Sequence, residues 1–144
     1  MTSGFATSHA EVARVDTNGI LRPLLEDNAE QSPRVIAWFD LPSDERPRLR
    51  VSPSTLSEVV FVLTGARMRL PRERVVRYLD IILEMPFEFD EPAVIARAIE
   101  FYRTVHDDWD DCLVAAYALE YNDGVVFSFD HGFDHIPGVT RIEP

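Results

Sequence analysis

The sequence has one cysteine, no lysine and no long apolar run in its 144 residues. A single cysteine excludes an intrachain disulfide, and no stretch approaches the ~18 apolar residues that span a bilayer. The N-terminal segment MTSGFATSHAEVAR lacks the basic start and the apolar centre of a signal peptide. We therefore expect a cytoplasmic protein that begins with a loose tail, residues 1–13.

The one thiol belongs to an apolar segment. Cys112 opens the run Cys112–Ala116, and no feature that would lower its pKa accompanies it. Such surroundings are typical of a core position rather than of a nucleophile. The sequence therefore predicts a buried, unreactive cysteine.

Composition and length indicate one folded domain, expected over residues 14–144. Apolar residues make up 46% of the chain, which excludes a disordered protein. The net charge of −11 by itself argues against a nucleic-acid partner, but the charges are unevenly distributed along the sequence. Residues 105–144 hold nine acids against one arginine, whereas residues 65–77 carry five arginines against one acid.

The arginine-rich segment, residues 65–77, supplies planar groups that suit phosphate or carboxylate. A solvated charged helix explains the same residues equally well. The arginines are Arg67, Arg69, Arg72, Arg74 and Arg77.

Strands and helices alternate along the sequence. Hydrophobic periodicity and capping signals predict strands ending at Val15–Asp16 and over 49–51, 87–89, 125–129 and 139–142, with helices over 20–25, 33–39, 55–64, 71–83, 92–102 and 108–121. Val59–Leu63 is apolar enough for a strand, but a capping box at Thr55–Glu58 favours a helix. The alternation predicts an α/β fold, a three-layer α/β/α sandwich with a mostly parallel sheet of four to five strands.

Four acidic residues are predicted where strands end or helices begin. Asp16 and Asp130 each follow a strand, and Glu58 and Asp111 lie near the starts of helices. Parallel strands bring such positions to one edge of a sheet, where carboxylates repel one another unless a cation lies among them. The pattern predicts a site for Mg²⁺ or Mn²⁺, which prefer oxygen ligands.

Each acid also has a purely structural explanation. Asp16 and Asp130 suit turns, Glu58 suits a capping box, and Asp111 suits the positive end of a helix dipole. A dipole does not explain the four acids crowded into 107–111, because like charges repel.

The histidines carry a weaker signal. His131 and His135 have a spacing compatible with zinc, but no cysteine pair or third histidine accompanies them. His9 and His106 carry no readable signal. A Mg²⁺-dependent phosphotransferase is a further alternative, but it usually needs a second aspartate where Asn18 stands.

Four segments, in order, resemble the motifs of PIN-domain proteins, and the compact chain most resembles the VapC-type toxins of bacterial toxin–antitoxin pairs. The segments are Val15–Asn18, Ser54–Val59, Asp108–Leu119 and Ser128–Phe133. Phe129 and Gly132 depart from the fourth motif. The likeness extends from Val15 to Ile142, nearly the whole chain.

The resemblance implies an endoribonuclease that hydrolyses RNA phosphodiester bonds with Mg²⁺ or Mn²⁺. It assigns these roles by position: Asp16, Glu58, Asp111 and Asp130 as catalytic and metal-binding acids, Asp108 as an auxiliary acid, Thr17 and Asn18 as orienting residues, and Ser128 as a supporting hydroxyl.

The resemblance also implies an antitoxin partner and a homodimer. The arginine-rich segment would line a groove that receives RNA or the C-terminal segment of the antitoxin. The alternative is a catalytically silent PIN-like module that binds RNA or protein, which the four intact acids oppose.

Overall fold

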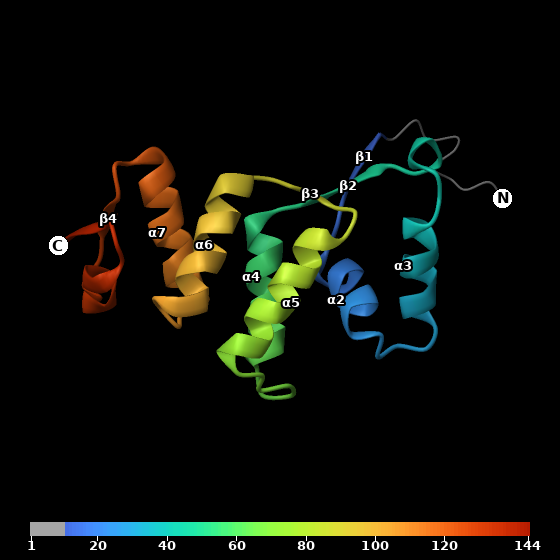
Figure 1. Ribbon diagram of the computed structural model, residues 1–144, viewed down its shortest axis with the longest axis horizontal. Coiled ribbons are helices and arrows are strands. Elements are labelled where there is room, and N and C mark those ends of the chain that lie inside the picture. Colours follow the sequence, from blue (N-terminus) through green and yellow to red (C-terminus); the bar gives the residue numbers. More distant parts are fainter. Residues whose placement is uncertain (1–10) are drawn as a thin grey trace. The chain divides into compact units, whose positions relative to one another are not determined.

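The computed structural model describes residues 11–144 as a succession of helices and short strands (Figure 1). The chain forms two compact units. Unit 1 comprises the residues up to Val59 together with Asp80–Asp90, and unit 2 comprises Val60–Leu79 and Glu91–Pro144. Most of the predicted tail lies outside the described residues, and the first strand begins at Val12. No helix in the described range is long and apolar enough to cross a membrane.

Unit 1 is built on a parallel three-stranded sheet. Its strands β1 (Val12–Arg14), β2 (Arg48–Val51) and β3 (Glu88–Phe89) are hydrogen-bonded in that order. Helices α2 (Thr17–Leu25) and α3 (Gln31–Phe39) and the 3-10 helix η1 (Ser43–Glu45) connect β1 to β2. Such a long crossover is what parallel strands require.

An acidic residue after β3 ties the sheet of unit 1 together. Asp90 accepts hydrogen bonds from Arg14 on β1 and from Arg50 on β2, the latter with Nη2–Oδ1 at 2.7 Å. The bond from Arg14, then that from Arg50, holds the pKa of Asp90 below its ordinary value. Ion pairs between Asp90 and the arginines of β1 and β2 therefore add to the backbone hydrogen bonds that join the three strands.

Helices α4 (Pro53–Thr64) and α5 (Arg72–Glu84) each have residues in both units. The predicted helix over Val59–Leu63 is confirmed, since these residues lie inside α4. The predicted capping box is wrong, because α4 begins at Pro53 and places Thr55 within its first turn. Ser52 precedes the helix instead and accepts a hydrogen bond from the Thr55 N–H at 3.4 Å.

Unit 2 packs helices against a separate sheet of two parallel strands. It contains α6 (Pro92–Thr104), α7 (Trp109–Tyr121), the 3-10 helix η2 (His131–His135), and β4 (Val125–Phe127) paired with β5 (Thr140–Ile142). Small residues of α7, Ala115 and Ala118, pack with Val126, Phe133 and Ile136 in one buried cluster. The α/β class with parallel strands is confirmed.

Cys112 is fully buried on α7, as its apolar run predicts. Its Sγ donates to the backbone oxygen of His106 at 3.4 Å. Burial, reinforced by the nearby charges of Asp108 and Asp111, raises the pKa of the thiol to about 12. The neutral thiol is therefore the form that the fold favours.

We expect Cys112 in the folded protein to react with a thiol reagent at pH 8 on the order of a thousandfold more slowly than in urea, because only the thiolate reacts. Measuring the labelling rate against urea concentration checks this. Rapid labelling of the folded chain would contradict a buried thiol, and labelling should rise together with the unfolding transition seen by circular dichroism.

Candidate active site

Asp16 joins β1 to α2 in unit 1. Its backbone is extended, and its Oδ1 accepts a hydrogen bond from the Gly19 N–H at 2.9 Å, which caps α2. The side chain is exposed. Asp16 therefore has the structural role that a turn-forming aspartate would have, and it also presents a carboxylate to solvent.

Glu58 is held by the residue that follows Asp16. The Thr17 hydroxyl donates to Glu58 Oε2 at 2.7 Å, although the two residues are 41 positions apart. Glu58 lies in the middle of α4 with an exposed side chain, so it does not cap the helix. Its one described contact orients the carboxylate toward the start of α2. Thr17 thus orients the second acid of unit 1, while Asn18 lines a neighbouring pocket.

Asp108 and Asp111 mark the start of α7 in unit 2. Asp108 is the N-cap, and its Oδ1 accepts from the Asp111 N–H at 3.0 Å. Asp111 Oδ2 lies 2.9 Å from His106 Nε2. Asp108 thus has a capping role, whereas a side-chain partner outside the helix holds Asp111.

His106 is the residue that sequence reasoning missed. It is buried between α6 and α7, with Nε2 on Asp111 and Nδ1 at 3.2 Å from His135 Nε2. An ionised carboxylate only accepts, so His106 Nε2 carries the proton that bonds Asp111. The Phe133 ring stacks on the imidazole. The only signal in the sequence was a histidine directly before the acidic run.

Asp130 caps η2, and Ser128 and Phe129 separate it from the end of β4. Its Oδ1 accepts from the Gly132 N–H at 2.8 Å, and its own N–H donates to Ser128 Oγ at 2.9 Å. A Cβ on Gly132 would lie 3.0 Å from both Asp130 Oδ1 and His106 Cε1. Glycine, a departure from the fourth PIN motif, therefore lets the Asp130 turn close against the imidazole that holds Asp111.

Arg141 contacts two further side chains of this turn, those of His131 and Asp134. Its Nε donates to Asp134 Oδ1 at 2.9 Å, and its Nη2 lies 2.9 Å from His131 Nδ1. The bond from Arg141 holds the pKa of Asp134 below its ordinary value. His131 contacts Arg141 and Asp134, whereas His135 contacts His106.

Comparison with known proteins identifies the family. Residues 14–139 match the PIN domain, a range that includes all four predicted acids. The chain belongs to the PIN-domain family. No curated protein matches the sequence. The structure is similar to a crystal structure of VapBC2 from Rickettsia felis bound to a DNA fragment from their promoter. The likeness has 14% sequence identity and a TM-score of 0.37, and covers 92% of this chain and 98% of that one.

The acids of this PIN domain belong to both units. Asp16 and Glu58 lie in unit 1, whereas Asp108, Asp111 and Asp130 lie in unit 2. Among residues 11–144 no three His, Cys, Asp or Glu side chains are close enough to hold a metal ion. The donor chemistry nevertheless fits, because carboxylates held in place by hydrogen bonds are the ligands that hard divalent cations take.

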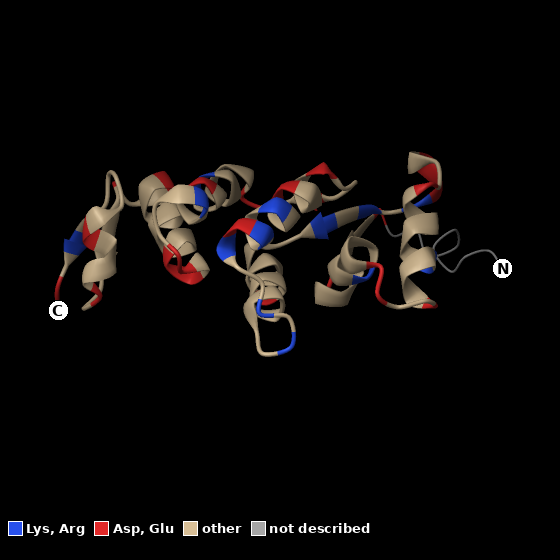
Figure 2. Ribbon diagram, turned by 60° about the horizontal axis from the view of Figure 1, so that its bottom comes forward, with Lys and Arg blue, Asp and Glu red and all other residues tan. Residues whose placement is uncertain are grey.

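The arginines of the PIN domain's residues 65–77 follow the end of α4 and the start of α5 in unit 2. Figure 2 shows basic residues along this loop and helix. Arg67 and Arg69 are exposed in the loop, and the Arg74 guanidinium lies 5.9 Å from the centre of the Tyr78 ring. The segment is therefore a basic surface within an acidic chain.

Proposed function

We propose that this PIN domain is an endoribonuclease that hydrolyses RNA phosphodiester bonds with Mg²⁺ or Mn²⁺. One observation carries the proposal: each of the four acids predicted to bind the metal is anchored by a hydrogen bond to one of its carboxylate oxygens. The bonds run from Gly19 to Asp16, from Thr17 to Glu58, from His106 to Asp111 and from Gly132 to Asp130.

Asp16, Glu58, Asp111 and Asp130 would hold the ion in this proposal. A bound Mg²⁺ or Mn²⁺ would activate a water and neutralise charge on the scissile phosphate. The chain's own contribution is to orient the carboxylates before the ion arrives: Thr17 fixes Glu58, and His106 fixes Asp111. In-line attack by water would leave a 5′-phosphate and a 3′-hydroxyl.

We propose that RNA binds at the arginine-rich segment, because its positive charge attracts phosphate although the whole chain has a net charge of −11. Five arginines in thirteen residues attract phosphate and release counterions on binding. In a VapC-like toxin, the antitoxin would compete for the same basic surface through its C-terminal segment. We propose this antitoxin partner and a homodimer on the family resemblance.

The second candidate is a silent PIN-like module that binds RNA or protein without cleaving it. The helix caps favour it, because Asp16, Asp108 and Asp130 each stabilise a helix start and so have a role that needs no metal. Metal dependence separates the two candidates.

The purified chain is expected to cleave structured RNA with Mg²⁺ or Mn²⁺ and to lose cleavage in EDTA. Adding back Mg²⁺ should restore it, because the ion supplies the activated water. Gel analysis of 5′-labelled RNA gives the rate, and phosphatase sensitivity gives the end chemistry. Equal cleavage with and without EDTA would contradict the proposal, and RNA binding with no cleavage in any divalent metal would favour the silent module.

A further inference from the structure

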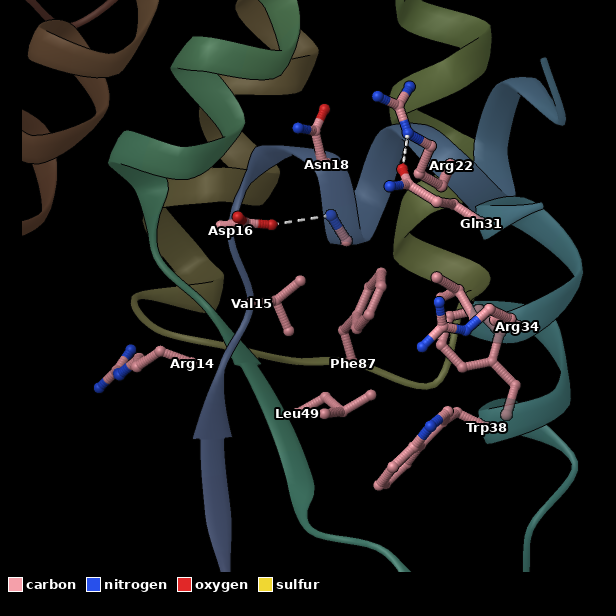
Figure 3. A pocket seen from close by; sticks show the side chains of 13 residues that line it. Arg14, Val15, Asp16, Asn18, Arg22, Gln31, Arg34, Trp38, Leu49 and Phe87 are labelled. Atoms are coloured by element: carbon pink, nitrogen blue, oxygen red, sulfur yellow. Dashed lines mark hydrogen bonds between the residues drawn. The ribbon is translucent and has the colours of Figure 1, made fainter. Parts of the chain in front are cut away.

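A pocket of about 560 Å³ opens in unit 1 beside Asp16. Figure 3 shows the rings of Trp38 and Phe87 and the side chain of Leu49 at this pocket, across from the start of α2. Its wall also includes Arg14, Arg22 and Arg34. The pocket thus combines flat aromatic groups, cations and a candidate catalytic carboxylate.

The aromatic side of the pocket is built to take a flat ligand. Phe87 packs edge-on against Phe39, with ring centres 5.5 Å apart and planes at 83°. The Trp38 side chain, by contrast, is 37% exposed although it is a large apolar group. Aromatic side chains with an accessible face stack on the bases of single-stranded RNA without sequence preference.

The pocket has an exposed cation that can contact an anion. Three arginines line it, but Arg14 is hydrogen-bonded to Asp90 and Arg22 Nη1 lies 3.7 Å from Asp27 Oδ1, whereas Arg34 is exposed. Arg22 Nε donates to Gln31 Oε1 at 2.7 Å, which fixes its guanidinium at the wall. An apolar peptide side chain would need the rings but no cation, whereas a nucleotide uses both.

We propose that this pocket binds an unstacked base of the RNA substrate, next to the phosphate on which Asp16 acts, with Arg34 contacting a flanking phosphate. The assignment rests on the proposed ribonuclease activity and adds a substrate subsite to it. Trp38 is the stacking residue, and Arg34 is an exposed phosphate contact.

Binding of a single-stranded adenosine hexanucleotide in EDTA tests the subsite apart from cleavage. Stacking should quench the fluorescence of Trp38, one of the two tryptophans in the chain. Trp38→Ala is expected to weaken binding about tenfold, and Trp38→Phe to keep most of the affinity because it keeps a ring. Arg34→Gln should reduce the dependence of log affinity on log salt by about 0.7. Trp38→Ala should leave that slope unchanged.

Two controls make the result specific to the pocket. Phe61→Ala removes a 77% exposed aromatic ring that does not line the pocket, and it should bind as wild type does. An abasic oligomer of equal charge should bind wild type and Trp38→Ala equally.

Equal binding of the adenosine hexanucleotide by Trp38→Ala and wild type would overturn the subsite even if metal-dependent cleavage is observed. Tighter binding of an uncharged apolar peptide than of RNA would also overturn it. Trp38-dependent RNA binding without cleavage would support the subsite and reject the ribonuclease activity.

Discussion

Asp16→Asn is expected to lower the rate of metal-dependent RNA cleavage at least about a hundredfold. Removing a residue that only orients a metal ligand already lowers metal affinity or activity about ten- to a hundredfold, and Asp16 is proposed to bind the metal itself. Asparagine is as good an N-cap as aspartate, so it can still accept the Gly19 N–H that caps α2. The substitution therefore removes the charge and keeps the helix start. Cleavage rate at saturating Mg²⁺ and the unfolding midpoint in urea are the two measurements.

Asp44→Asn is the matched control for charge. Asp44 is an exposed acid of the same unit, in η1, and the change alters the net charge equally. We expect it to cleave as wild type does. Unchanged cleavage by Asp16→Asn would end the proposed role of Asp16, whereas loss of cleavage together with a lower unfolding midpoint would mean that the cap was lost.

Glu58→Gln extends the same test to the second acid of unit 1. Glutamine keeps an oxygen for the Thr17 hydroxyl but loses the charge, and Glu58 caps no helix. Mn²⁺ affinity should therefore fall with the unfolding midpoint unchanged. Equal Mn²⁺ affinity in wild type and both variants would show that these acids do not bind the metal.

His106→Ala has the second large expected effect, because it removes the hydrogen bonds to Asp111 and to His135 at once. Loss of a group that orients a metal-binding carboxylate costs about ten- to a hundredfold in metal affinity or activity. The lost hydrogen bonds and the cavity under Phe133 should also lower the free energy of unfolding by roughly 2–4 kcal/mol. Mn²⁺ titration and urea unfolding measure the two effects separately.

His106→Gln distinguishes orientation from packing. Its side-chain amide N–H can take the place of the imidazole Nε2–H, so it should restore Mn²⁺ affinity more than stability. His131→Ala, which removes a ring with a 74% exposed side chain, should change neither Mn²⁺ affinity nor cleavage by a comparable amount. If His106→Gln restores stability without Mn²⁺ affinity, His106 is a packing residue alone.

The positions of the helices could be predicted because their signals are local. The apolar face of α6 recurs at helical spacing from Val94 to Tyr102, and these residues are buried. Pro71 directly before α5, Pro92 as the first residue of α6 and Gly65 directly after α4 mark the ends of these helices. The choice of helix over strand at Val59–Leu63 was right although the capping box cited for it was not, because Ser52 precedes the helix rather than Thr55.

The contacts of the candidate site could not be predicted in the same way. Thr17 and Glu58 meet across 41 positions, and His106 meets His135 across 29. No periodicity or spacing encodes such pairs, since they depend on which helix start lies beside which turn. His106 was therefore overlooked, and the turn at Asp134 became interpretable only when Arg141 was found to hold it.

The sequence by itself determined the α/β class, the PIN family, the buried thiol and the placement of Asp108 and Asp111 at a helix start, because each depends on residues near one another in the chain. The tertiary structure decided which of those acids are anchored and by what. It freed Glu58 from a capping role and placed a buried imidazole behind Asp111. A hydrogen bond between distant residues depends on the folded path of the backbone, which local propensity does not specify.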